Sequence, residues 1–164
     1  MTNILIPTDF SIASVKMAEE AVRALQCKKA NIILFHAFML PDPVDMLMGS
    51  RRKPYYDLVN AGFHRACKLV KEQNSEVIHA IQFRCMEGST NALFRNFAEA
   101  NDIDIIFCPE QYDYRQVHAL SLDPRPFFKR SGIALVQRSG PRKKDLQHKE
   151  MPAPVIPVQL VPTN

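Results

Sequence analysis

The stretch from Asn31 to Phe38 is apolar at almost every position, so its odd-numbered and its even-numbered side chains are both hydrophobic. A strand with one face in water alternates apolar and polar residues, whereas a strand of a parallel sheet is covered by helices on both faces. Two further runs of this kind are Asn3 to Thr8 and Ile103 to Cys108. The sequence therefore predicts a parallel sheet enclosed between two layers of helices.

The segments between these runs have the spacing of amphipathic helices. Their apolar residues recur every three or four positions, in three stripes: Val15, Ala18, Ala21, Val22 and Leu25; Leu58, Val59, Gly62, Phe63, Ala66, Leu69 and Val70; and Leu93, Phe94, Phe97 and Ala98. Ser11 and Gly88-Ser89-Thr90 are expected to begin the first and third of these helices. Glu76 to Arg84 alternates and predicts an outer strand, and Ile133 to Val136 predicts a short last one. This order predicts a three-layer, doubly wound α/β sandwich.

A length of 164 residues, 46% hydrophobic and 23% charged, is sufficient for one domain. We expect this domain to cover residues 1–138. Residues 139–164 are rich in proline and contain the basic cluster Arg142-Lys143-Lys144, which is typical of a tail. Within the tail, Val155 to Val161 is apolar enough to dock in extended form on the domain or on a second copy of it.

Nothing in the sequence indicates a membrane or an exported protein. No apolar stretch approaches the about 20 residues that span a bilayer, and the residues after Met1 lack the pattern of an export signal. We expect a cytoplasmic location. The cysteines form no C-x-x-C pair and are interpreted as reduced thiols: Cys27, Cys67, Cys85 and Cys108.

Two other features of the sequence, its basic clusters and a methionine-rich segment, give little indication of function. The net charge is +4, and Arg51-Arg52-Lys53 is a second basic cluster, but neither cluster contains aromatic residues, so we interpret both as solvated charge and expect no nucleic-acid partner. The segment from Met39 to Met48 is either an adaptable apolar binding loop or a cover for the sheet edge.

Four short motifs resemble, in order, those of the universal stress proteins. The string Ile4-Leu5-Ile6-Pro7-Thr8-Asp9-Phe10-Ser11 resembles the opening strand and turn of that family, and Ile33-Leu34-Phe35-His36-Ala37 resembles its second strand. Gly88 and Asp104-Ile105-Ile106-Phe107 continue the match, which covers about Asn3 to Gln137. The resemblance implies a UspA-like, adenine nucleotide alpha-hydrolase-like fold with five parallel strands in the order 3-2-1-4-5. A ligand crevice is then expected at the carboxyl ends of strands 1 and 4.

Many members of that family bind ATP through the pattern G-x-x-G-x9-G-[S/T] after strand 4. That spacing places Pro109, Tyr112 and Leu122 at the three glycine positions and Asp123 at the hydroxyl position. Pro109 lacks a backbone donor, the two larger side chains prevent close approach to phosphate, and Asp123 adds a like charge. The resemblance therefore implies a site that has lost its phosphate loop.

Other positions keep the family pattern or offer alternatives. The residues that similar members use around adenine and ribose are retained at Pro7, Asp9 and Ala37. Asp9 either contacts a ligand or caps the first helix. Asp123, just before Pro124, is expected to cap the helix that precedes strand 5. In a rebuilt phosphate loop, Arg115 and Arg125 would be the phosphate donors.

A cysteine hydrolase is a further, less favoured alternative. Cys108 would be the nucleophile, His36 its base and Asp9 the residue that orients the base. However, a single histidine near the end of a buried strand is typically a hydrogen-bonded core residue, and a cysteine in an apolar strand is typically inert.

From these observations we expect a non-catalytic regulatory or interaction module of the universal-stress type, with no cofactor. The principal alternative is an ATP-binding member with a rebuilt loop. We also expect a homodimer that pairs through Ile133 to Val136, because an apolar edge strand left bare would favour aggregation. A further protein partner is compatible with the sequence, which does not identify one.

Overall fold

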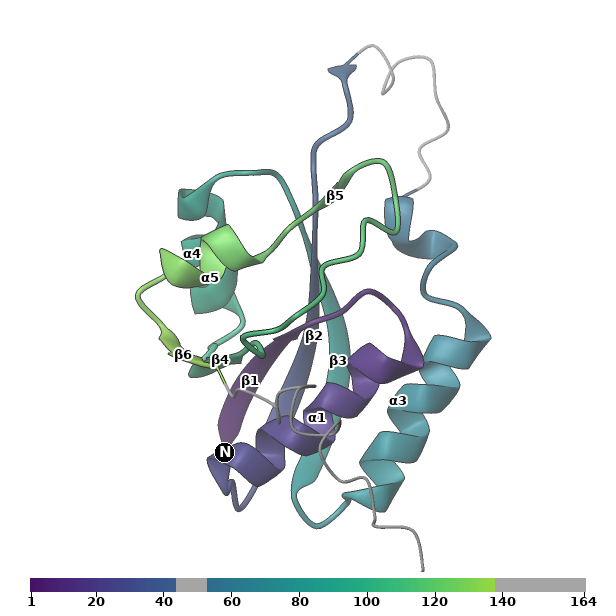
Figure 1. Cartoon of the computed structure of the whole chain (residues 1–164), viewed down its shortest axis with the longest axis vertical. Coiled ribbons are helices and arrows are strands. Elements are labelled where there is room, and N and C mark those ends of the chain that lie inside the picture. The colour runs from purple at the N-terminus through teal and green to yellow at the C-terminus, as the bar shows by residue number, and fades with distance from the viewer. Residues whose placement is uncertain (44–52, 138–164) are drawn as a thin grey trace, which may run out of the picture.

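The structure, a computed structural model, describes residues 1–43 and 53–137. Five strands form a parallel sheet in the order β3-β2-β1-β4-β6 (Figure 1). Their bounds are β1 (Thr2–Pro7), β2 (Ala30–Phe38), β3 (Ile78–Glu87), β4 (Ile105–Phe107) and β6 (Ala134–Val136). The predicted order 3-2-1-4-5 is confirmed, with β6 as its fifth strand. The strand expected in Glu76 to Arg84 corresponds to β3, which extends to Glu87 and lies at the edge of the sheet, as predicted.

Helices cover both faces of this sheet, which confirms the three-layer α/β architecture. The long helices α1 (Ile12–Leu25) and α3 (Ala61–Gln73) pack against each other on one face. The other face is covered by α4 (Asn91–Ala100) and the short α5 (Arg125–Lys129). A 3-10 turn, η1 (Pro54–Tyr56), precedes α3.

Polar side chains mark where three of the helices begin. Ser11 and Thr90 each accept a hydrogen bond from the backbone N–H three residues later, as the sequence predicts. The second helix begins later than its apolar stripe indicates, because Asn60 is its N-cap and leaves Leu58 and Val59 in the preceding turn.

The two faces of the sheet form two separate cores. Ile4, Ile6 and Leu34 face α1 and α3, whereas Leu5 and Phe35 face α4 and α5. All five side chains are fully buried. Helices cover the side chains on both faces of β1 and β2, so these strands do not alternate between apolar and polar residues. This is the physical basis of the prediction made from the apolar runs.

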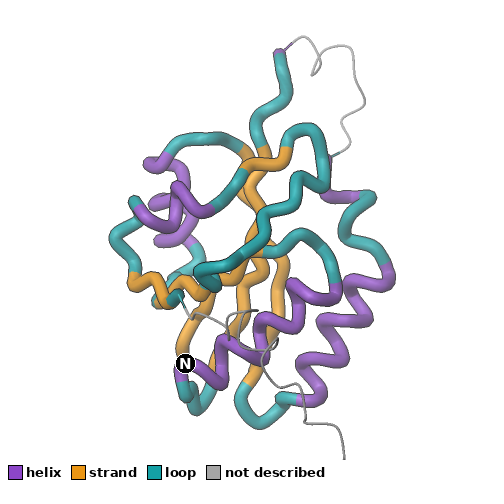
Figure 2. The backbone as a smooth tube through the Cα atoms, viewed as in Figure 1, coloured by secondary structure: helices purple, strands orange, loops and turns teal. Residues whose placement is uncertain are grey.

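Apart from the short turn η1, one element was not predicted. The strand β5 (Ser121–Leu122) pairs antiparallel with Ala37 and Phe38 of β2. The pairing of β1 with β2 ends at Pro7 and Phe35, so β5 occupies the edge of β2 that lies beyond the end of β1. We call residues 109–122 the crossing segment; Figure 2 shows this loop passing from β4 to β2 before the chain turns back to α5.

Some predictions fall on residues that the structure does not describe. They are the docking of the tail in residues 139–164, most of the Met39 to Met48 segment, and the basic clusters apart from Lys53. In residues 1–43 and 53–137, no helix is long and apolar enough to cross a membrane.

Candidate functional site

A hollow of about 410 Å³ lies where β1 and β4 end, between the start of α1 and the first residues of the crossing segment. This is the switch point of the sheet, where the strand order reverses and ligands of such folds bind. Asp9 and Pro109, which follow the carboxyl ends of β1 and β4, both line it. The rest of its wall includes Ser11, Ser14, Glu20, Tyr112, Asp113 and Arg115.

Asp9 is tied to the start of α1. Its Oδ1 accepts hydrogen bonds from the backbone N–H of Ser11, at 3.0 Å, and from the Ser11 hydroxyl. Ser11 is the N-cap, and its Oγ in turn accepts the N–H of Ser14 at 3.1 Å. Burial by itself raises the pKa of Asp9, but the hydrogen bonds from Ser11, together with Ser14 and the charge of Arg115, hold the pKa below its ordinary value. Asp9 therefore positions the N-cap residue Ser11 and is not itself the N-cap of α1.

The turn between β1 and α1 is held in an uncommon conformation. Phe10 has a φ of 62°, in the left-handed region that non-glycine residues rarely adopt. Its backbone N–H donates to Oγ1 of Thr8 at 3.0 Å, and the Thr8 hydroxyl lies 2.7 Å from that of Ser14. This conformation directs the Phe10 ring to the end of β2, 5.0 Å from the His36 ring.

The two arginines considered as phosphate donors each lie against a carboxylate. Nη1 of Arg115 is 3.7 Å from Oδ2 of Asp9, and the Arg115 side chain is 67% exposed. Arg125 donates to Asp123 from its backbone N–H at 3.0 Å and from Nη2 at 2.6 Å. Burial raises the pKa of Asp123, but the hydrogen bonds from Arg125 have the larger effect, so the pKa is below its ordinary value. Each arginine is thus already paired with a carboxylate of the same chain, Arg115 weakly and Arg125 closely.

Asp123 lies at the start of α5 but is not its N-cap. The helix begins at Arg125, and Pro124 is the capping residue, one position later than the sequence predicts. The Asp123 carboxylate nevertheless accepts the N–H of Arg125, the first helical residue. An anion of the chain therefore occupies this helix start.

Two of the three positions that the resemblance assigns to adenine and ribose, Pro7 and Ala37, are covered by the chain, whereas Asp9 lines the hollow. Pro7 is buried, and Ala37 is 0% exposed. Ala37 is paired with Met86 of β3 on one side and with Leu122 of β5 on the other. Leu122, at one of the former glycine positions, thus lies directly beside a position that the resemblance assigns to the nucleoside.

The other former glycine positions form a turn at the start of the crossing segment. The backbone N–H of Tyr112 donates to the carbonyl of Pro109 at 2.9 Å. The Tyr112 side chain packs against the core that contains Leu5 and Phe35. Its hydroxyl has a raised pKa, chiefly because it is buried.

His36 links three segments through a chain of hydrogen bonds. Its Nδ1 lies 2.6 Å from the carbonyl oxygen of Thr8, and its Nε2 lies 2.9 Å from the hydroxyl of Ser121. Ser121 Oγ also accepts the backbone N–H of His118 at 3.1 Å. Burial lowers the pKa of His36 more than the Thr8 carbonyl and the nearby Asp9 raise it. His36 is thus a hydrogen-bonded core residue, as the sequence favours.

The structure does not assemble a cysteine hydrolase site. Cys108 is 1% exposed, and burial raises the pKa of its thiol to about 11. Its Sγ is directed to the carbonyl of Pro109, while both ring nitrogens of His36 are bonded to Thr8 and Ser121. Among residues 1–43 and 53–137, no group of three or more histidine, cysteine or acidic side chains could hold a metal ion.

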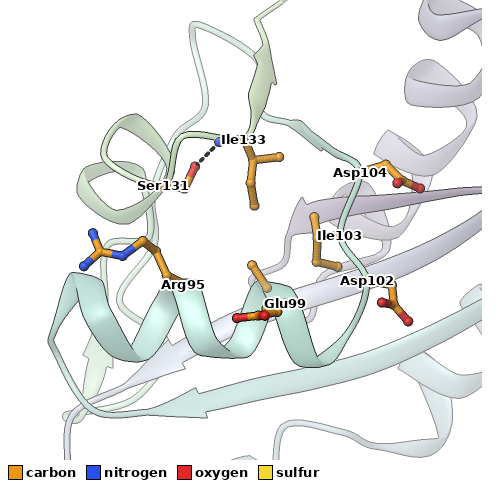
Figure 3. A pocket seen from close by; sticks show the side chains of 8 residues that line it. Arg95, Glu99, Asp102, Ile103, Asp104, Ser131 and Ile133 are labelled. Atoms are coloured by element: carbon orange, nitrogen blue, oxygen red, sulfur yellow. Dashed lines mark hydrogen bonds between the residues drawn. The ribbon is translucent and has the colours of Figure 1, made fainter.

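A second hollow, of about 380 Å³, lies at the opposite end of the sheet (Figure 3). Its wall contains Arg95 and Glu99 of α4, together with Asp104 before β4 and Ser131 before β6. The Ser131 hydroxyl oxygen accepts the backbone N–H of Ile133 at 3.1 Å. Because this hollow borders the amino ends of β4 and β6, it is separate from the switch point.

Sequence reasoning missed Ser121 and His118, which anchor the crossing segment. Ser121 is buried although it lies in a long irregular segment. A strand of two residues has no periodicity, so the only sequence signal is the small apolar group Ala119-Leu120-Ser121-Leu122 within a polar stretch.

No protein-family model matches this chain. No curated protein matches it either. Among solved structures, the crystal structure of a hypothetical protein, PH0823, is 14% identical, with a TM-score of 0.52 over 87% of this chain and 98% of that one. This likeness shows a shared fold.

The solved structures that match include two universal stress proteins. One is a universal stress protein in complex with cAMP, 15% identical, with a TM-score of 0.45 over 84% of this chain and 96% of that one. The other is the universal stress protein UspA from Lactobacillus plantarum, 16% identical, with a TM-score of 0.47 over 83% and 96% of the two chains.

Proposed function

We propose that this chain is a non-catalytic regulatory or interaction module of the universal-stress type, in which the chain itself occupies the place of a nucleotide. The observation that carries the proposal is the pairing of β5 with β2. Ser121 and Leu122 are bonded beside Ala37 and Phe38, beyond the end of β1. A nucleoside at this position would have to displace a hydrogen-bonded strand.

The phosphate positions support the same conclusion. A phosphate binds where backbone N–H groups are free and the local charge is positive. Here Asp123 accepts the N–H of Arg125, so the start of α5 already holds an anion. Asp9, whose pKa is lowered, places a negative charge in the crevice, beside Arg115. A phosphate would therefore find the N–H of Arg125 already bonded and would be repelled by the carboxylates of Asp123 and Asp9.

The chemistry of the crevice gives no support to catalysis. A nucleophile needs a lowered pKa or an adjacent base. The Cys108 thiol has a raised pKa of about 11, and neither ring nitrogen of His36 is directed at it. We therefore propose binding of a partner, rather than conversion of a substrate, as the activity of the domain.

Among residues 1–43 and 53–137, β6 has a strand partner on one side only, and this supports a homodimer as the form in which the module acts. β6 pairs with β4 on one side, and Ile133, Leu135 and Val136 are only half-buried. Pairing with a second copy would satisfy the backbone groups on the outer edge.

Calorimetry with Mg·ATP, AMP and adenosine tests the nucleotide part of the proposal. If only the phosphate contacts were lost, adenosine and AMP would still bind. Because the nucleoside position is covered, we expect that none of the three gives measurable binding at about micromolar concentration. Micromolar binding of any of them, or nucleotide that purifies with the protein, would overturn this part.

Two variants distinguish the rebuilt-loop alternative. If ATP binds through Arg115 and Arg125, then Arg115→Ala and Arg125→Ala each abolish that binding, whereas adenosine binding is unchanged. Arg95→Ala is the matched control, because Arg95 lines the hollow at the opposite end of the sheet. The alternative requires ATP binding in the unmodified chain, so its absence there would exclude this mode.

A further inference from the structure

Two histidines hold the last part of the crossing segment, residues 118–122, which we call the closing turn. Nδ1 of His118 accepts the backbone N–H of Leu120 at 3.1 Å. The Thr8 carbonyl can only accept, so Nδ1 of His36 carries a proton and Nε2 accepts from the Ser121 hydroxyl. Each histidine therefore supports the closing turn through a ring nitrogen that is unprotonated.

We propose that the closing turn is an acid-released latch: protonation of His118 places an N–H against the N–H of Leu120, releases the turn, and uncovers the end of β2 at Ala37 and Phe38. Histidine is the side chain whose charge ordinarily changes between pH 5 and 8, which is why a histidine that accepts this backbone N–H makes the turn sensitive to acid. This inference rests on the proposed function, because the closing turn is the part of the chain that covers Ala37.

His118 is the more accessible of the two histidines. His118 is half-buried, whereas His36 is 3% exposed. The titratable groups that face His36 are Asp9 and His118. Asp9 favours a charged His36 but is already bonded to Ser11, and a charge on His118 opposes one on His36. While the latch is closed, His36 is thus the neutral anchor and His118 is the sensor.

Release of the closing turn leaves the sheet intact. The turn is joined to β2 through the two-residue β5 ladder, the hydrogen bond from the Met39 N–H to the Leu120 carbonyl, at 2.7 Å, and the bond between Ser121 and Nε2 of His36. The rest of β2 is paired with β1 on one side and with β3 on the other. Opening therefore breaks a few local bonds, as in a sub-global unfolding event of low free energy.

Amide hydrogen exchange, measured by NMR on the full chain, tests this inference. The reporter is the Met39 amide, which is bonded to the closing turn, and the internal control is the Leu34 amide in the centre of β2. Between about pH 7.5 and about pH 5.5, we expect the protection factor of Met39 to fall about tenfold, as for the loss of one hydrogen bond, while that of Leu34 changes little.

The matched variant is His118→Asn, whose side-chain oxygen can accept the Leu120 N–H but cannot be protonated. We expect Met39 in this variant to keep its protection at both pH values. Unchanged protection of Met39 in the unmodified chain, or an equal fall in His118→Asn, would overturn the latch. No nucleotide is present in this experiment, so its failure is distinguishable from a failure of the proposed function, which calorimetry at neutral pH decides.

Discussion

The hydroxyl of Ser121 lies 2.9 Å from Nε2 of His36, a residue 85 positions earlier in the chain. This bond joins the crossing segment to the end of β2 inside the protein, where both side chains are buried. The Thr8 carbonyl at the opposite nitrogen sets the ring tautomer, so the Ser121 hydroxyl donates to Nε2. The covered crevice therefore depends on one serine in an otherwise irregular segment.

We expect Ser121→Ala to lower the free energy of unfolding by about 1 to 3 kcal/mol, because it leaves Nε2 of His36 buried without a donor. Urea denaturation followed by circular dichroism measures the change, since the chain contains no tryptophan. Ser75→Ala is the control: Ser75 is exposed, and its replacement should change the free energy by less than about 0.5 kcal/mol. Equal effects of the two substitutions would contradict the role of the Ser121 hydroxyl.

Stability should fall as the pH is lowered from about 7.5 to about 5.0. Burial lowers the pKa of His36 from its ordinary value of 6.5, so the unfolded chain binds a proton that the folded protein does not. The contribution of neutral His36 to the free energy of unfolding is complete above pH 6.5 and is lost as the pH falls below that value. The lowered pKa values of Asp9 and Asp123 change the stability only when the pH falls below their ordinary pKa of 3.8, which is outside this range. A urea midpoint that stayed constant or rose over this range would refute the prediction.

Asp9→Ala should destabilise the protein more than Asp9→Asn. The alanine variant loses the acceptor for the Ser11 N–H and hydroxyl, so we expect a loss of about 1 to 2 kcal/mol. Asparagine keeps a side-chain oxygen at that position and should cost less than about 1 kcal/mol. Thermal unfolding of both variants measures the difference. Equal losses would show that the charge beside Arg115, rather than the bond to Ser11, is the important feature.

Cys108 should resist alkylation in the folded protein. At about pH 7.5 we expect no reaction of iodoacetamide with this thiol while the protein is folded, because it is buried and its pKa is raised to about 11. All four cysteines should react after unfolding in urea, which is the control. Mass spectrometry of the peptides identifies each site. Rapid and selective labelling of Cys108 in the native state would instead revive the cysteine-enzyme interpretation.

Leu135→Pro should convert the expected homodimer to a monomer, whereas Leu135→Ala should not. The carbonyl of Val136 accepts the Cys108 N–H, so the backbone groups of Leu135, one residue earlier, point to the outer edge. Proline removes that outward donor and blocks pairing, while alanine removes only the side chain. Light scattering gives the mass of each. A monomer mass for the unmodified chain at every concentration would argue against the homodimer.

Much of the fold could be predicted from local patterns. Side chains of both parities are apolar in β1 and β2 because helices cover both faces, so a parallel sheet between two layers follows from the residues themselves. Ser11 and Thr90 mark helix starts because each supplies an oxygen to an otherwise unpaired N–H. The order of the strands required the resemblance, since periodicity does not state which strands are neighbours.

The covering of the end of β2 by β5 was decided by the tertiary structure alone. β2 continues through Ala37 and Phe38, whereas its neighbour β1 stops pairing at Pro7, which leaves an edge of β2 with free backbone groups. A free edge can bond to whichever segment lies near it, and here that segment is Ser121 and Leu122. The sequence determined the strands and helices because each buries a periodic set of side chains. It could not determine β5, because two residues have no period and their partner is set by where another strand ends.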